Sequence, residues 1–265
     1  MKRNCQRLFL AILIIIITIG VCGCDMNNNP TVGSESGNNA SNMPENVELN
    51  SRQIQILEDQ GLPQNYSELL FSQKKAIVAI EELLSYVESK YDIEFCYAGY
   101  VEASVLEAER LIVYPAGGTE STDCFSITRS SDGTITDEYM NVALRAGYSE
   151  LVLSLVEDAL ISENAKVFVD VTKTTLTSVP DDIDQLKGNV EGVSVIFVDG
   201  SVMSGEQFES FVSSVKQALE EKQMYGMAHI ILLNKDTLKY LTQYNYTDYL
   251  DPECYTERES IHIKK

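Results

Sequence analysis

The sequence predicts an α+β fold, in which helices pack on small, largely antiparallel sheets that form two lobes. Apolar residues recur at helical spacing before the first strand-like runs. Three short runs of alternating residues then follow one another with no long helix between them. After Asn164 the pattern changes to longer runs rich in Val and Ile. We therefore expect a first lobe at residues 51–163 and a second at 164–265.

The first 23 residues have the layout of a secretory signal peptide. Three basic residues precede an apolar stretch from Leu8 to Ile19, and small glycines follow. A transmembrane helix needs about 20 apolar residues to cross roughly 30 Å of hydrocarbon, and polar sequence begins directly after Cys24. We favour a cleaved signal at residues 1–23, with an uncleaved anchor helix as the alternative.

The residues Val21-Cys22-Gly23-Cys24 resemble the lipobox of bacterial lipoproteins. That motif has an aliphatic residue three positions before the cysteine and a small residue directly before it, and both match here. The resemblance implies cleavage after Gly23 and attachment of a diacylglyceryl group to Cys24. Two acyl chains anchor a protein durably, whereas one binds only marginally. The implied location is the cell membrane, lipid-anchored on the extracytoplasmic face.

The charge of the chain argues against some classes of partner. The net charge is −20, and removal of Lys2, Arg3 and Arg7 with the signal takes away three positive charges and no negative ones, leaving −23. Nucleic-acid binding depends on Lys and Arg neutralising phosphates, so that class is disfavoured. Solubility in a crowded envelope is the favoured explanation of the charge, and binding of cationic peptides or divalent ions is the alternative.

Residues 24–50 are rich in Asn, Ser, Gly, Pro and Glu and hold hardly any apolar side chains. Such a segment cannot bury enough surface to offset the entropy lost on ordering. We expect a flexible tether that holds the folded body a few tens of ångströms from the bilayer, on the order of 5 to 6 Å times the square root of its length.

The first lobe begins with a short helix in "SRQIQILEDQG", which Gly61 ends. A longer helix with an apolar stripe from Ile77 to Tyr91 follows. After three strands, the turn "SSDG" leads to a helix that Asp137 can cap. Its apolar stripe includes Leu144, Tyr148, Leu151, Leu155 and Val156. The predicted strands are 94–101, 110–115 and 124–129.

In the second lobe, a strand and a linker rich in Asp precede a strand, a helix and a further strand. The run Ser204-Gly205-Glu206-Gln207 forms a capping box and predicts the start of a helix. A short helix is expected from Asp236, and "SIHIK" reads as the final strand. The other predicted strands are "KVFVDVTK", "VSVIFVDG" and "MAHIILLN".

A second resemblance covers part of the first lobe. The stretch "GLPQNYSELLFSQKKAIVAIEELLSYVESKYDIEFCYAGYV" is similar to a segment of uncharacterised membrane-anchored lipoproteins of Gram-positive bacteria. In that group a long helix runs into a "KYxxEF" strand, and an Asp-x-Tyr turn follows downstream, here Asp137-Glu138-Tyr139. The resemblance implies an envelope location and a shared fold, and it brings no catalytic residue.

After removal of the signal, and with Cys24 acylated, three cysteines remain: Cys96, Cys124 and Cys254. A bridge between Cys96 and Cys124 requires Cα atoms within about 7 Å, so their strands would have to be direct neighbours. A simple meander instead places the strand "RLIVYP" between them. Free thiols are the favoured interpretation, and the bridge stays open as the alternative.

We find no catalytic signature in the sequence. His229 and His262 lie in strand patterns without a carboxylate or cysteine at ligand spacing, so we predict no metal site and no cofactor there. The acids of "PDDIDQLKGN" lack the spacing of a calcium loop, and a solvated loop or helix start is favoured. An enzyme is not excluded, but a non-enzyme is favoured.

Tyrosines gather near the C-terminus, among several acids. A tyrosine presents a flat apolar body with a polar tip, which suits a sugar or a peptide. Tyr246 and Tyr249, in the loop "YNYTDYLDP", are the candidate partner face, whereas helix packing accounts for Tyr240 and Tyr244. We expect a non-catalytic binding or accessory module at the cell envelope that contacts a protein, peptide or glycan. The alternatives are a solute-binding receptor of a transporter and an envelope enzyme.

Overall fold

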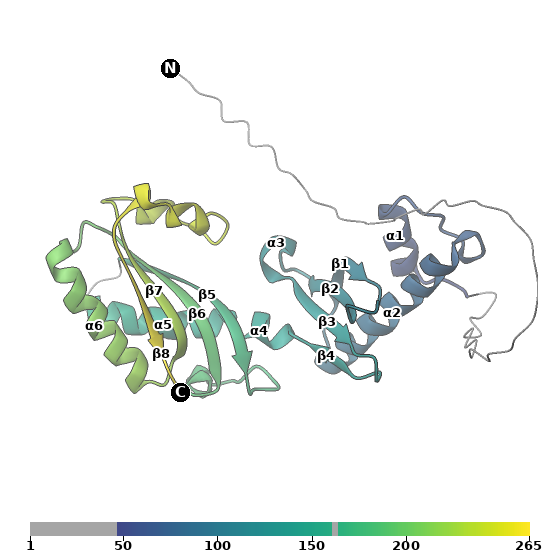
Figure 1. The fold of residues 1–265 in the computed structure, drawn as a ribbon, viewed down its shortest axis with the longest axis horizontal. Coiled ribbons are helices and arrows are strands. Elements are labelled where there is room, and N and C mark those ends of the chain that lie inside the picture. The colour runs from purple at the N-terminus through teal and green to yellow at the C-terminus, as the bar shows by residue number, and fades with distance from the viewer. Residues whose placement is uncertain (1–46, 161–163) are drawn as a thin grey trace, which may run out of the picture. The chain divides into compact units, whose positions relative to one another are not determined.

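The computed structural model describes residues 47–160 and 164–265 (Figure 1). The predicted signal peptide at residues 1–23, the lipid attachment residue Cys24 and most of the predicted tether lie outside these described residues. Within the described ranges, no helix is long and apolar enough to cross a membrane. The last tether residues are described, and Val47 and Leu49 pack against the first hydrophobic core.

The described chain forms two four-stranded sheets, and each sheet carries its own hydrophobic core. The strand orders are β1-β2-β3-β4 and β5-β6-β7-β8. Every pair of neighbouring strands is antiparallel except β6 and β7. The predicted α+β fold with largely antiparallel sheets is therefore confirmed.

The helices of the first lobe begin and end at recognisable signals. Asn50 caps the first helix, because its side-chain oxygen accepts a hydrogen bond from the Gln53 N–H at 2.8 Å. The second helix ends at Asp92, which adopts the left-handed conformation with φ of 56°. The helical segments are α1 (Ser51–Asp59), η1 (Tyr66–Glu68), α2 (Phe71–Tyr91) and α3 (Glu120–Asp123).

The first sheet is a meander whose inner face lies against α2. Leu111, Val113 and Ile127 are fully buried in one cluster with Leu83 and Leu84 of α2. This alternation of buried and half-exposed side chains is what a sheet covered on one face requires. The strands are β1 (Phe95–Val101), β2 (Glu109–Pro115), β3 (Phe125–Arg129) and β4 (Ile135–Asp137), and the sequence did not predict β4.

The predicted helix after Asp137 is two helices, α4 (Tyr139–Ala143) and α5 (Arg145–Leu160). Asp137 ends β4, and its Oδ1 accepts a hydrogen bond from the Tyr139 N–H at 3.2 Å. The sequence assigned this helical segment to the first lobe. In the structure its buried side chains, among them Leu144 and Tyr148, belong to the core of the second sheet.

The second sheet contains a β-α-β crossover. β6 and β7 are parallel, so α6 carries the chain from the carboxyl end of one strand to the amino end of the other. The last strand, β8, is antiparallel to β7 at the edge of the sheet, and residues 256–260 of β8 are exposed. The elements are β5 (Ala165–Thr174), η2 (Ile183–Leu186), β6 (Val190–Val198), α6 (Gly205–Glu221), β7 (Tyr225–Leu233) and β8 (Tyr255–Ile263).

Both faces of this sheet carry a hydrophobic cluster. One face packs against α5 and α6. At the other face, Phe197, Ile231 and Leu233 pack against residues 238–255, a segment of short turns that we call the C-terminal cap. Figure 1 shows the cap in yellow, connecting β7 to β8. Its helical turns are η3 (Leu238–Tyr240), η4 (Tyr246–Leu250) and η5 (Pro252–Cys254).

The parallel strands approach each other closely at a pair of glycines. Gly192 of β6 is paired with Gly226 of β7, whose φ is +121°. A Cβ atom at Gly226 would lie 1.9 Å from the carbonyl oxygen of Gly192. Only glycine fits there, both for its conformation and for the space available.

Candidate functional site

A pocket of about 600 Å³ lies at the carboxyl edge of the parallel strands. This is the edge at which sheets with parallel strands bind ligands, because the loops that leave the strands meet there. The volume is within the range of small-molecule sites, roughly 300 to 1,000 Å³. The lining residues come from three segments, 200–207, 232–235 and 256–257.

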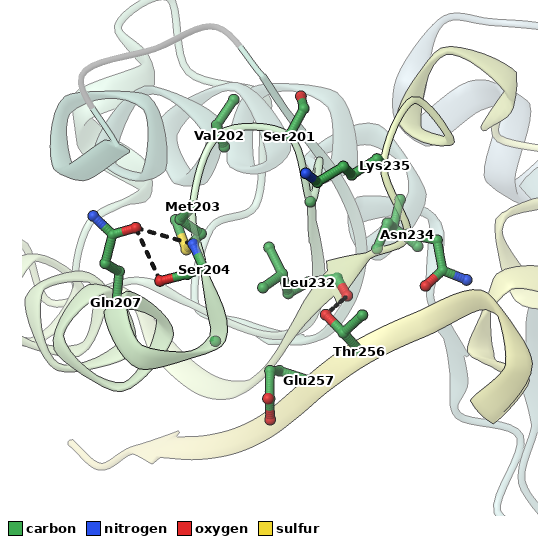
Figure 2. Close-up of a pocket in the computed structure, with 13 residues that line it drawn as sticks. Ser201, Val202, Met203, Ser204, Gln207, Leu232, Asn234, Lys235, Thr256 and Glu257 are labelled. Atoms are coloured by element: carbon green, nitrogen blue, oxygen red, sulfur yellow. Dashed lines mark hydrogen bonds between the residues drawn. The ribbon is translucent and has the colours of Figure 1, made fainter.

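The first wall of the pocket is the start of α6. The side-chain oxygen of Gln207 accepts hydrogen bonds from the Ser204 N–H at 2.9 Å and from the Ser204 hydroxyl at 3.2 Å (Figure 2). The backward half of the predicted capping box is thus present. It holds the loop and the helix start in one conformation, so this wall is built before any ligand arrives.

Asp199 ties this loop to the C-terminal cap. The residue is only 5% exposed. Its Oδ1 accepts hydrogen bonds from the N–H groups of Ser201 at 2.9 Å and Asp236 at 3.1 Å, and its Oδ2 from the N–H of Leu238 at 3.2 Å. Burial acts to raise the pKa of Asp199, but these hydrogen bonds outweigh it and hold the pKa below its ordinary value. The carboxylate therefore stays ionised and joins two segments that are distant in sequence.

Two charged side chains line the pocket from its other walls, Lys235 after β7 and Glu257 on β8. Within the described part of the chain, no ion pair is recorded for either of them. The Glu257 carboxylate lies beside the start of α6, since a Cβ atom at Gly205 would lie 2.8 Å from its Oε1. In Figure 2 the Lys235 side chain extends toward the side of the pocket that carries Val202 and Met203. The pocket thus offers one cation and one anion to a ligand.

The predicted partner residues lie in the C-terminal cap. Tyr246 is half-buried and stacks on Phe168, with ring centroids 4.5 Å apart and planes 7° from parallel. Tyr249 is also half-buried and packs against the same cluster. The outward tyrosines of the cap are Tyr240 and Tyr244, which are 60% and 70% exposed. Helix packing, expected for Tyr240 and Tyr244, is therefore not what the structure shows.

The two histidines do not come together as a metal site. His229 Nδ1 lies 2.8 Å from the Ser260 hydroxyl, and burial, with the positive charge of Arg258, lowers the pKa of His229. The imidazole is therefore neutral at pH 7. His262 is exposed on the edge strand β8. Across the described ranges, no cluster of three or more His, Cys, Asp or Glu side chains is placed to hold a metal ion.

The acidic run before η2 forms a local turn. Asp182 accepts a hydrogen bond from the Asp184 N–H at 2.9 Å, and Asp184 pairs with Lys187 at 2.5 Å. Asp182 and Asp184 thus have protein partners in a local turn, which fits the predicted solvated helix start.

The three described cysteines are free thiols. The strand β2 lies between β1, which carries Cys96, and β3, which follows Cys124. Burial, together with Glu120 and Asp123, raises the pKa of the Cys124 thiol. A thiol with a raised pKa holds little thiolate at neutral pH and is a weak nucleophile.

Sequence reasoning did not find the pocket. One signal was present, since an Asp-Gly pair after an apolar strand and a capping box a few residues later mark a sharp strand-to-helix turn. The other walls, at Lys235 and Glu257, depend on how β7 and β8 pair. That pairing is a long-range property that local patterns do not report.

Comparisons with known proteins identify no family for this chain. No family model matches the chain, and no curated protein matches it. A solved structure of a DUF5037 family protein from Ruminococcus gnavus aligns with a TM-score of 0.35 and 13% identity, covering 69% of this chain and 89% of that one. A second, from Lactobacillus casei and described as a "putative redox protein", aligns with a TM-score of 0.24 and 12% identity over 51% of this chain and 89% of that one. With such low TM-scores, neither similarity indicates a ligand or a reaction.

Proposed function

We propose that this protein is a lipid-anchored binding module on the extracytoplasmic face of the cell membrane, and that its ligand site is the pocket at the carboxyl edge of β6 and β7. The observation that carries the binding role is the pocket itself, with Lys235 and Glu257 as oppositely charged side chains on its walls. The anchor rests on the motif from Val21 to Cys24.

The chemistry of the pocket favours a ligand with both polar and apolar parts. Lys235 would pair with an anionic group of the ligand. Glu257 would pair with a cationic group or accept hydrogen bonds. Leu232 and Met203 add apolar surface. Peptides and glycans of the envelope offer such combinations.

The exposed tyrosines of the C-terminal cap supply a second contact surface close in sequence to the pocket. Tyr240 and Tyr244 follow Lys235 along the chain, and Asp199 ties the loop at the pocket to the start of the cap. Tyrosines contribute large contact areas at a low cost in side-chain entropy. We propose that Tyr240 and Tyr244, in place of the more buried Tyr246 and Tyr249, contact a larger ligand.

The pocket is tested by cross-linking in intact cells, followed by isolation of the full chain and identification of what is attached to it. The test variant is Lys235→Ala with Glu257→Ala, which removes both charges without changing the net charge. The control is Lys216→Ala with Glu220→Ala. These two residues form an exposed pair on α6, 3.8 Å apart, and neither lines the pocket.

We expect the pocket variant to lose at least tenfold in captured ligand and the control to match the unaltered chain. Equal capture by the two variants would rule out the pocket as the ligand site. The anchor has its own measurement, the mass of the mature N-terminus: a chain recovered uncleaved and without a lipid on Cys24 would refute the anchor but not the pocket.

A further inference from the structure

One end of the first lobe displays four apolar side chains to solvent. Leu70 and Phe71, at the start of α2, are 66% and 67% exposed, and Val105 and Leu106, in the loop between β1 and β2, are 102% and 93% exposed. Single exposed apolar residues are ordinary on protein surfaces, but a group of large ones marks an interaction site. We call these four residues the apolar end.

The topology brings the two pairs to the same end of the lobe. α2 and β1 are joined by a tight turn at Asp92, so β1 returns along the helix and its far end lies beside the start of α2. An ion pair of 2.9 Å between Lys75 and Glu102 joins these segments. Lys75 lies about one helical turn after Phe71, and Glu102 lies just before Val105.

The loop that carries Val105 and Leu106 is held by its own hydrogen bonds. The Ser104 hydroxyl accepts from the N–H groups of Leu106 at 3.2 Å and Glu107 at 3.1 Å, and the Ser104 N–H donates to the Glu107 carbonyl at 2.9 Å. This turn leaves both aliphatic side chains pointing outward in one conformation. Apolar side chains that a hydrogen-bonded turn keeps exposed are well placed to contact an apolar surface outside the protein.

We propose that the apolar end inserts into the interfacial region of the bilayer that carries the anchor, an inference that rests on the proposed function. Twenty-two residues, 25 to 46, separate Cys24 from Val47, which packs in the first core. The flexible tether that the sequence predicts would span roughly 25 Å at that length, and the anchor would then keep the first lobe within reach of the membrane. Tethering raises the effective concentration, and a small apolar contact then suffices.

The charge of the protein also favours an apolar contact over an electrostatic one. The mature chain expected after cleavage has a net charge of −23 and is repelled by anionic headgroups, so basic residues do not drive its adhesion. At the apolar end Lys75 and Glu102 neutralise each other, and the exposed Glu107, directly after Leu106, adds a negative charge. Binding through Val105 and Leu106 should therefore not weaken as the salt concentration rises, because salt screens the repulsion.

Tryptophan fluorescence tests this contact, because the chain contains no tryptophan of its own. The acylated full chain carrying Leu106→Trp is reconstituted in vesicles of phosphatidylcholine and phosphatidylglycerol at three to one, with and without brominated phosphatidylcholine. Bromine quenches only a tryptophan that enters the bilayer. The matched control is Val179→Trp, which replaces an apolar residue of the second lobe that is 56% exposed.

We expect brominated lipid to reduce the emission of the Leu106→Trp chain at least twofold, at low and high salt alike, and to leave the Val179→Trp control unchanged. Adding Val105→Asp to the first variant should abolish the quenching. Unquenched emission from an anchored Leu106→Trp chain would overturn the docking and leave the proposed anchor intact. Blue-shifted emission without quenching would also overturn it, in favour of a protein partner at the apolar end. A chain whose N-terminus carries no lipid refutes the anchor first, and the docking with it.

Discussion

The first sheet packs against helices on its inner face, whereas the second sheet is covered on both. In the first, Ile112 and Tyr114 on the outer face remain half-buried, and buried residues alternate along β2. In the second, the carboxyl ends of β6 and β7 are continuously buried, because helices cover one side and the C-terminal cap covers the other. The extra layer is irregular, a series of short helical turns. Lys235 precedes this layer in the sequence and Thr256 follows it directly, and both residues line the pocket.

Because of this difference, we expect some parts of the molecule to contribute mainly to stability and others mainly to binding. The helix-covered faces supply the two large cores, and the cap adds a smaller third cluster. Loops and caps over a rigid sheet are common places for binding, since they can vary without disturbing the core. We therefore expect substitutions at the close strand pair to lower the free energy of unfolding most. The loss should become smaller in turn at the pocket loop, in the cap and in the first lobe.

The largest effect is expected at the glycine pair of the parallel strands. Gly226→Ala should lower the free energy of unfolding of the second lobe by ~3 kcal/mol or more, because it adds a clash with Gly192 to an unfavourable φ. The matched control is Gly133→Ala in the first lobe, where φ is +85° but a Cβ would contact nothing within 4 Å. That change should cost about 1 kcal/mol. Urea titrations read by hydrogen exchange in each lobe give both values, and similar costs would mean that the strands can separate.

The second largest effect is expected at Asp199. Asp199→Ala leaves three backbone N–H groups without their acceptor and should cost about 2 to 3 kcal/mol in unfolding free energy. Asp132→Ala is the control in the first lobe, since Asp132 also accepts a backbone N–H, from Thr134 at 2.9 Å, but is exposed. Its loss should lower the unfolding free energy less than the loss of Asp199 does, because water can replace an exposed acceptor. If amide hydrogen exchange at residues 236–238 became faster only in the Asp199 variant, the lost stability would come from these hydrogen bonds.

The same residue predicts how stability depends on pH. The pKa of Asp199 is lowered in the folded protein, so its contribution is complete above the pKa of the unfolded chain, near 3.8, and is lost as the pH falls through the folded value. Stability of the second lobe should decline more steeply below about pH 4 in the unaltered protein than in Asp199→Asn. Urea midpoints from pH 2.5 to 6 measure this. Parallel curves for the two chains would show that another carboxylate is responsible.

In the cap we expect smaller losses of unfolding free energy, which differ between a packed tyrosine and an exposed one. Tyr246→Ala removes the ring stacked on Phe168 and should cost about 2 kcal/mol. Tyr240→Ala changes a side chain that is 60% exposed and should stay within about 0.5 kcal/mol. Thermal unfolding of the full chain compares the two variants. An equal loss for both would mean that the cap's outer tyrosines are also structural.

The smallest effect is expected in the first lobe, at the ion pairs between α1 and α2. Arg52 contacts both oxygens of Glu81, at 2.7 and 3.1 Å, and one oxygen of Glu88 at 2.5 Å. Arg52→Lys keeps the charge but loses the two-pronged contact, so we expect a loss of about 1 kcal/mol. Lys75→Ala, at an exposed pair, should cost at most about 0.5 kcal/mol. Exchange rates in α1 should rise only in the first variant.

Local patterns were sufficient for the fold class and for most elements. The helix at Phe71–Tyr91 and the start of α6 near Ser204 follow from apolar spacing and capping residues, which act within a few positions. β4 was missed because three residues, Ile135–Asp137, are too few to show alternation. The sequence also assigned α5 to the wrong sheet. An apolar stripe indicates that a helix is buried, but it does not indicate which sheet the helix packs against.

The site was harder to predict for the same reason. Turn residues around Tyr246 indicated a loop, which is correct, but its ring is half-buried because Phe168, on a distant strand, lies against it. Tyr240 and Tyr244 have helical spacing, yet the chain is helical only from Leu238 to Tyr240 there. Lys235 and Glu257 reach one pocket only through the pairing of β7 with β8.

The charged edge of the second sheet has a consequence for a protein attached to a membrane surface. If many copies are held on one membrane as we propose, their local concentration is far higher than in free solution, and an open strand edge invites pairing between copies. Along β8 the exposed Glu257, Arg258 and Glu259 occupy that edge. If β8 strands of two copies paired, these charged side chains would come close together and would lose part of their hydration. The charged edge strand should therefore disfavour strand pairing between neighbouring copies on the membrane.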